Sequence, residues 1–199
     1  ADLGGVFGPI SFVPDGLGVF LSVVATFIGS LAVIFSVNYM HGEKQLSRYY
    51  AYMLFFIGAM VGLVLTSNML LMFVFWEITA LCSYALISFN SDDPKAVAGG
   101  VKALIMTQIG GIGLLLGALV LYIYTGQMDY NILLANPAAI PAQLLPVMAF
   151  GFLVAAAAKS AQFPFQTWLP DAMEAPTPIS ALIHAATMVN AGVYLLARF

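Results

Sequence analysis

Six long apolar stretches with short polar connections limit what this sequence can fold into more than any other feature does. They cover residues 17–40, 49–66, 69–89, 97–124, 144–169 and 178–197. A helix needs about 20 mostly apolar residues to cross a hydrocarbon layer about 30 Å thick. Because no linker divides the stretches into groups, the sequence predicts an all-α membrane protein with about six transmembrane helices in one bundle.

The composition excludes the soluble classes of protein. Hydrophobic residues make up 62% of the 199 residues and charged residues 8%, whereas ordinary globular chains contain roughly 45–50% and 25%. A soluble chain with so few charges could not cover its surface with polar groups. This excludes a soluble enzyme, a nucleic-acid-binding protein and a disordered tail. The single cysteine, Cys82, permits no internal disulfide and argues against a thiolate metal site.

Four titratable residues lie within or at the edge of the predicted spans: Glu77, Lys102, Lys159 and His184. The other charged residues fall in connections or at the ends of spans. A charge at the centre of a bilayer costs at least about 2.5–3.5 kcal/mol on insertion scales, so such groups face the bundle interior and mark ion or proton paths. We therefore predict that these four side chains face the interior and take part in proton translocation.

Glu77 and Lys159 give the strongest indications of a role in proton translocation. Glu77 lies near the middle of its span, where its alternative role is an anchor between two helices. Lys159 is followed by Pro164, which removes one helix hydrogen bond and predicts a broken helix at membrane depth. The alternative is a lysine that snorkels to the interface. Trp168 argues against this alternative, because a tryptophan there is a plausible interface anchor.

Lys102 and His184 give weaker signals. Lys102 lies near the start of its span, where snorkelling to the interface explains it as well as transport does. His184 shares a helix face with Ser180 and Thr187, and it either relays protons or bonds to a neighbouring helix. The sequence contains no phosphate-binding glycine loop, no HExxH motif and no cysteine cluster. It therefore predicts no cofactor and no metal or haem centre.

Three glycines form a stripe on the fourth span. Gly110, Gly113 and Gly117 lie on one helix face. Small residues at this spacing let two membrane helices approach closely. We interpret the stripe as a packing face.

Two segments carry a distinctive pattern. Residues 159–173 (KSAQFPFQTWLPDAM) run into 175–189 (APTPISALIHAATMV), and residues 68–77 (NMLLMFVFWE) precede 81–84 (LCSY). Together with residues 47–52 (SRYYAY), they resemble the antiporter-like membrane subunits of respiratory complex I (NADH:quinone oxidoreductase) and of Mrp-type multisubunit cation/proton antiporters. The similarity extends over essentially the whole chain.

The resemblance implies a fold of two inverted repeats of five helices, each with a discontinuous helix. Residues 1–48 would form the N-terminal region with the first helix, and residues 49–199 the first repeat. The second repeat would be absent, so the chain looks like a fragment. In the family, the glutamate at the position of Glu77 pairs with the broken-helix lysine at the position of Lys159. A second lysine matches Lys102, and the histidine matching His184 connects the half-channels along a hydrated polar axis.

The function implied is a subunit that translocates protons, or exchanges Na⁺ for H⁺, without bond chemistry or a cofactor of its own. Its partners would be other membrane subunits of the assembly, the lipid bilayer and H⁺ or Na⁺, with no nucleic acid. The location implied is a bacterial or archaeal inner membrane, as a multi-pass protein. The rival hypothesis is a structural scaffold whose buried charges only lock helices together.

The parent assembly and the coupled ion stay open at the level of sequence. Residues 173–176 (MEAP) look more like the Mrp type, whereas residues 81–84 look more like the long complex I subunit. Asn190 stands where many large Mrp-type subunits have a lysine, and Gly111 where the complex I subunit often has an aspartate. An NADH:quinone oxidoreductase and a membrane-bound hydrogenase both remain candidate parents, so whether the assembly is an enzyme is undecided.

Overall fold

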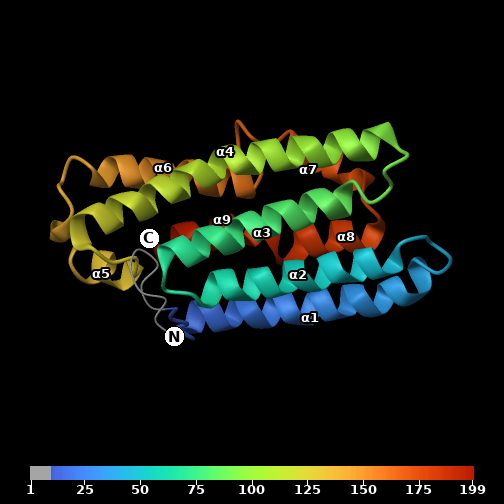
Figure 1. Cartoon of the computed structure of the whole chain (residues 1–199), viewed down its shortest axis with the longest axis horizontal. Helices are drawn as coiled ribbons and strands as arrows, with labels where there is room; N and C mark the ends of the chain where they lie inside the picture. Colours follow the sequence, from blue (N-terminus) through green and yellow to red (C-terminus); the bar gives the residue numbers. More distant parts are fainter. Residues whose placement is uncertain (1–9) are drawn as a thin grey trace.

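Long helices lying side by side form most of the molecule (Figure 1). The computed structural model describes residues 10–199, apart from the side chains of Ala185 and Ala186. The helices are α1 (Gly16–Tyr39), α2 (Leu46–Leu65), α3 (Met69–Ile87), α4 (Pro94–Thr125), α5 (Tyr130–Ala135), α6 (Leu145–Lys159), α7 (Trp168–Asp171), α8 (Thr177–Ala181) and α9 (Met188–Arg198). Short 3₁₀ turns cover Pro137–Ala139 and Ala172–Glu174, and a π-helical turn covers Leu182–Ala186.

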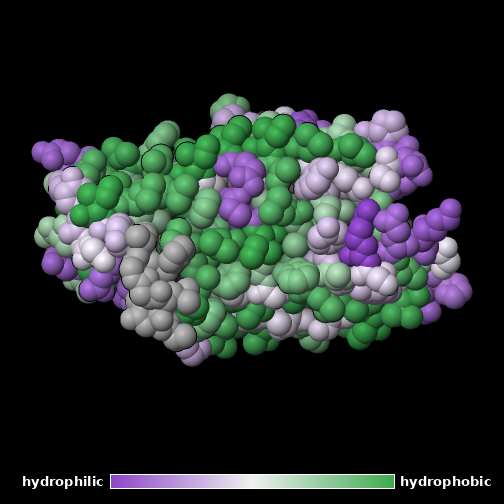
Figure 2. Space-filling model, viewed as in Figure 1, coloured by the Kyte–Doolittle hydropathy of each residue, from purple (hydrophilic) through white to green (hydrophobic). Residues whose placement is uncertain are grey.

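The helices have the length and surface of membrane-spanning segments. Within the described residues, α1, α2, α3, α4 and the segment Thr177–Arg198 are long and apolar enough to cross a membrane, whereas α6 is apolar but shorter. Phe27 on α1 and Ile123 on α4 are among the large apolar side chains that are more than half exposed. Hydrophobic atoms cover the length of the visible face, and hydrophilic atoms gather at its two ends (Figure 2). The predicted all-α membrane fold is confirmed.

The stretch of residues 144–169, in which Pro164 predicts a broken helix, is discontinuous in the structure. α6 ends at Lys159, five residues before Pro164, so the break comes earlier than the proline alone predicts. The chain reverses through Ala161, whose φ of +51° lies in the left-handed region that a helix cannot continue through. A discontinuity at membrane depth was predicted here, and its position places Lys159 at the helix end.

Trp168 has a different role from the one that its sequence position suggests. Its side chain is completely buried, so the interpretation of this residue as an interface anchor is wrong. The indole N–H donates a hydrogen bond of 2.9 Å to the carbonyl of Ala158. That carbonyl belongs to the last turn of α6, where a helix leaves its acceptors without partners. Trp168 therefore caps the broken helix from within the bundle.

The predicted span 178–197 is also interrupted. α8 and α9 are separated by the π-helical turn Leu182–Ala186 and by Thr187, which has φ −131° and ψ −86°. The Thr187 hydroxyl donates to the carbonyl of Leu182 over 2.5 Å, so a side chain takes up an acceptor that the helix ladder has released. His184 lies inside this interruption.

The glycine stripe on α4 lets α6 approach closely. A Cβ added to Gly110 would lie 2.6 Å from the Cβ of Ala158, and one added to Gly113 would lie 2.2 Å from the carbonyl oxygen of Gly151. Gly117 faces an aromatic ring of α6 in the same way. The interpretation of the stripe as a packing face is confirmed. This contact fixes the position of α6, and therefore of Lys159 at its end.

Candidate functional site

Lys159 lies at the end of α6 in the interior of the bundle, and its side chain has no exposed surface. Its Nζ donates a hydrogen bond of 2.9 Å to the backbone carbonyl of Trp76 on α3. The same nitrogen lies 5.0 Å from the centre of the Trp76 ring. A cation is also favoured at the C-terminus of a helix, where carbonyl groups face outward. A lysine in this position does not snorkel to the interface.

The helix α9 holds the turn that follows Lys159. The Ser160 hydroxyl donates a hydrogen bond of 2.6 Å to the carbonyl of Val189. Gly192 permits the close contact, because a Cβ there would lie 2.5 Å from the carbonyl oxygen of Ala156 and would displace α6. The break after Lys159 and the interrupted span that carries His184 are therefore packed against each other.

Glu77 lies midway along α3, one residue after the carbonyl that binds Lys159. Its side chain is half-buried, and its Oε1 is buried without a hydrogen-bond partner in the described part of the chain. The side chain of Gln108, on α4, interacts with the carboxylate. Gly111 leaves room for it, since a Cβ there would lie 2.3 Å from Oε1. A hydrophilic patch interrupts the hydrophobic face near the middle of α3 and α4 (Figure 2).

Glu77 and Lys159 are neighbours without a direct ion pair. Their charges interact electrostatically between α3 and α6. Among residues 10–199, the ion pairs within 4.0 Å are those of Lys102 and of Arg198 with aspartates. The Glu77 carboxylate and the Lys159 ammonium are therefore further apart than 4.0 Å. The pairing of these residues that the family resemblance implies stays a prediction.

His184 is half-buried, and its Nε2 is buried without a hydrogen-bond partner among the described residues. No contact given by the structure joins it to Lys159, although the two helix breaks share the contact between Ser160 and Val189. An imidazole nitrogen left free in a membrane interior is available to accept or pass on a proton. Its predicted role in translocation stays a prediction.

The structure places Lys102 away from this pair. Its Nζ lies 2.7 Å from Oδ2 of Asp171 on α7, and the two side chains are 37% and 47% exposed. Gly99 permits this contact, because a Cβ there would lie 2.5 Å from the backbone oxygen of Asp171. Lys102 therefore belongs to a separate, partly exposed ion pair. Sequence reasoning missed Asp171, since the pairing depends on how the chain after the break folds back onto α4.

Two further neighbours of the site were also missed. Gln108 had a detectable signal, because an amide within an apolar span needs a polar partner inside the bundle. Trp76 had none. Its contribution comes from its backbone carbonyl and ring face, and only the docking of α6 brings these to the lysine.

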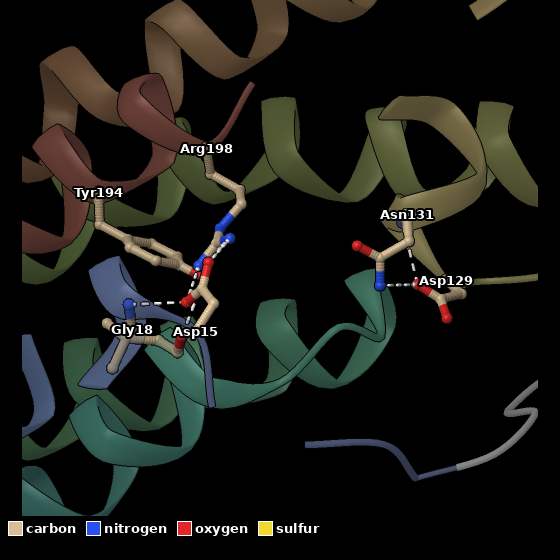
Figure 3. Close-up of polar contacts among 7 residues, drawn as sticks. Asp15, Gly18, Asp129, Asn131, Tyr194 and Arg198 are labelled. Atoms are coloured by element: carbon tan, nitrogen blue, oxygen red, sulfur yellow. Dashed lines mark hydrogen bonds and ion pairs between the residues drawn. The ribbon is translucent and has the colours of Figure 1, made fainter. Parts of the chain in front are cut away.

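A separate polar cluster joins the start of α1 to the end of α9 (Figure 3). Arg198, at the end of α9, forms a two-fold ion pair with Asp15, which caps the start of α1. Its Nη2 lies 2.9 Å from Oδ1 of Asp15, and its Nε donates to the hydroxyl of Tyr194 over 3.2 Å. The hydrogen bond from Arg198 lowers the pKa of Asp15 to about 2, and the cap on the Gly18 N–H acts in the same direction. The cluster ties α1 to α9.

The substitution Asp15→Asn is expected to lower stability at neutral pH and to remove a specific acid dependence. Because the pKa of Asp15 is lowered from 3.8, its stabilising effect is complete above pH 3.8 and is lost as the pH falls toward 2. The side chain is 35% exposed, so screening by solvent limits the effect to about 1 kcal/mol. Thermal unfolding of the full-length protein in detergent, followed between pH 2 and neutral pH, measures it. If Asp15→Asn loses stability in acid in the same way as the unmodified protein, this account is contradicted. Asp92→Asn, in an exposed turn, is the control and should keep the acid dependence of the unmodified protein.

Two family descriptions match this sequence. "NADH:quinone oxidoreductase/Mrp antiporter, TM" matches residues 66–199, which is most of the chain. "NADH-Ubiquinone oxidoreductase (complex I), chain 5 N-terminus" matches residues 2–50. The first match contains Glu77, Lys102, Lys159 and His184.

Individual proteins show the same similarity. The chain is 44% identical over 187 residues to Na⁺/H⁺ antiporter subunit A1 of Staphylococcus aureus strain bovine RF122 / ET3-1, and equally to that of strain JH9. Each alignment covers 92% of this chain and 23% of the relative. A chain of the Mrp complex from Dietzia sp. DQ12-45-1b superposes with a TM-score of 0.86 at 39% identity, covering 92% of this chain and 20% of that one. The chain thus spans about a quarter or less of the length of these proteins.

Proposed function

Because the chain belongs to the NADH:quinone oxidoreductase/Mrp antiporter transmembrane family, we propose that it forms a half-channel that moves protons, or exchanges Na⁺ for protons, within a multisubunit assembly. It is a multi-pass integral membrane protein. One observation carries the proposal: Lys159 is completely buried at the end of a broken helix, beside a Glu77 carboxylate with which it forms no direct ion pair.

The energetics of a buried lysine favour proton exchange at this position. Burial disfavours the charged form of a lysine, whereas a nearby carboxylate favours it. A small movement of Glu77 relative to Lys159 therefore changes how tightly the amine holds its proton. In the proposed cycle, the neutral amine takes up a proton as Glu77 approaches, and the ammonium gives it up as Glu77 moves away.

The other predicted residues have roles along the same path. His184, with its unpartnered Nε2 in the interrupted span, is the proposed acceptor of the proton that Lys159 releases. Lys102 and Asp171 form an exposed ion pair closer to the end of the bundle at which α4 begins, where they would exchange protons with the surface. Both assignments extend the proposal from the central pair to a route through the membrane.

The chain is proposed to act within a larger protein. Residues 1–48 would be the N-terminal region and residues 49–199 the first of the two inverted repeats. The turn after Lys159 is exposed at Gln162 and Phe163, the latter by 83%. Irregular backbone at membrane depth has to be covered by protein or line a water-filled cavity. Other membrane subunits or further parts of the same protein are the proposed partners of this face.

The substitution Glu77→Gln tests the proposal, because it keeps the shape of the side chain and removes its charge. In vesicles that contain the complete assembly, proton transport driven by an ion gradient is expected to fall by about tenfold or more, which corresponds to about 1.4 kcal/mol. The amount of assembled complex is expected to stay the same. Glu43→Gln, in an exposed turn, is the matched control and should transport normally.

The rival function, a structural scaffold, gives the opposite result. If the charges only lock helices together, the double substitution Glu77→Gln with Lys159→Met leaves both assembly and transport intact. Normal transport in the double variant would overturn the proposed function. In the single variant Lys159→Met, loss of assembly without a separate transport defect would also favour the scaffold.

A further inference from the structure

The tryptophan that precedes Glu77 contacts the proton-carrying amine in two ways. Its backbone carbonyl accepts a hydrogen bond of 2.9 Å from Nζ of Lys159, and the centre of its ring lies 5.0 Å from the same atom. Both Trp76 and Lys159 have no exposed surface. A cation within about 6 Å of a tryptophan ring is attracted by the ring quadrupole, most strongly where water is excluded.

Packing alone does not explain a tryptophan at this position. The indole Nε1 of Trp76 is buried and has no hydrogen-bond partner among the described residues. A buried donor without a partner costs about 1–3 kcal/mol. A phenylalanine or leucine would fill the interior without this cost. The contact between the ring and the ammonium is therefore the feature of Trp76 that an aliphatic residue could not reproduce.

The two contacts respond differently to the proton. A carbonyl oxygen accepts a hydrogen bond from either the ammonium or the neutral amine. The ring attracts only the charged form. From α3, Glu77 and Cys82 also interact with Lys159. Of the charged groups on α4 and α9, which pack against α6, Lys95 is exposed near the start of α4, Lys102 pairs with Asp171, and Arg198 pairs with Asp15.

We propose that Trp76 is a positioning residue for proton transfer: its carbonyl and its ring hold the Lys159 ammonium on α3 while the Glu77 carboxylate forms no direct ion pair with it. This inference rests on the proposed function of the Glu77–Lys159 site. The ring keeps the amine protonated when the carboxylate is distant, and Glu77 is free to move without the lysine losing its place. Release of the proton then requires two changes: the Glu77 carboxylate moves away from the ammonium, and the ammonium moves away from the Trp76 ring.

The pH dependence of transport distinguishes this role from a structural one. Trp76→Leu removes the ring, and the alkaline limb of the transport rate against pH is expected to move to lower pH by about one unit. Trp76→Phe keeps a weaker aromatic face and should give a smaller movement in the same direction. Phe56→Leu, a fully buried aromatic residue on α2, is the control and should lower thermal stability without moving the limb.

Fluorinated tryptophans placed specifically at position 76 give a test that leaves the shape of the side chain unchanged. Each added fluorine weakens the negative potential of the ring face, so the limb should move stepwise to lower pH. An unmoved limb across the fluorinated series, or a lower maximal rate at an unchanged limb in Trp76→Phe, would overturn the inference. If Glu77→Gln abolishes transport in the same vesicles, the proposed function survives that result. If Glu77→Gln and Lys159→Met both transport normally, the proposed function itself fails.

Discussion

Lys159→Met is expected to lower proton transport by at least about 100-fold, equivalent to about 2.7 kcal/mol on the barrier, while the assembly still forms. Methionine has nearly the same length and flexibility as lysine but no titratable group. Because the side chain is completely buried, replacing its charge with an apolar group removes a desolvation penalty. We therefore expect thermal stability to stay equal or to rise while transport is lost.

The measurement combines two readouts from the same membranes. Proton movement into inverted vesicles is followed with a pH-sensitive dye after an ion gradient is applied, and the amount of assembled complex is determined after mild solubilisation. Lys95→Met, an exposed lysine near the start of α4, is the matched control and should behave like the unmodified protein. Transport above about a tenth of normal in Lys159→Met would contradict the assignment of the proton to this residue.

Gly113→Ala is expected to separate α4 from α6 and to destabilise the bundle by about 1–3 kcal/mol or more, although it adds only one methyl group. The added Cβ would lie 2.2 Å from the carbonyl oxygen of Gly151. This neighbour is backbone, so it cannot rotate away as a flexible side chain does. Since α6 carries Lys159 at its end, we expect both the yield of assembled protein and its transport to fall.

Gly58→Ala is the matched control for the effect of a methyl group in a membrane helix. Gly58 lies within α2, and a Cβ there meets no atom within 4 Å. Alanine has the higher helix propensity, so this substitution should leave stability unchanged or raise it by up to about 1 kcal/mol. Thermal unfolding in detergent compares the two variants. Equal melting temperatures for Gly113→Ala and Gly58→Ala would show that the α4–α6 contact is looser than the structure indicates.

The boundaries of α1 to α4 could be predicted to within a few residues, because membrane spans are set by length and hydropathy, which are local properties. The boundaries of the two interrupted segments were harder to predict. Pro164 signalled a break, but the helix ends at Lys159, because Ala161 turns left-handed and Trp168 caps the carbonyl of Ala158. These contacts join residues that a local pattern does not connect.

The residues of the candidate site also divide into those that could be predicted from the sequence and those that could not. Glu77 and Lys159 were predictable, since a charge in hydrocarbon is costly wherever it lies in a span. Trp76 was not, because its ring and carbonyl reach the lysine only after α6 docks on α3. Lys102 could be predicted as a titratable residue near the start of its span, but its ion pair with Asp171 could not, because that contact forms only when the chain after the break folds back onto α4.

The sequence by itself determined that this chain crosses a membrane as helices and that a few titratable groups lie within them, because hydropathy and the cost of a buried charge depend on residue type and span position. Only the tertiary structure decided which of these groups meet. Docking of α6 on α4 through the Gly113–Gly151 contact sets where the end of α6 lies within the bundle. It therefore decides that the Lys159 ammonium lies against Trp76, close to Glu77 but not in a direct ion pair with it.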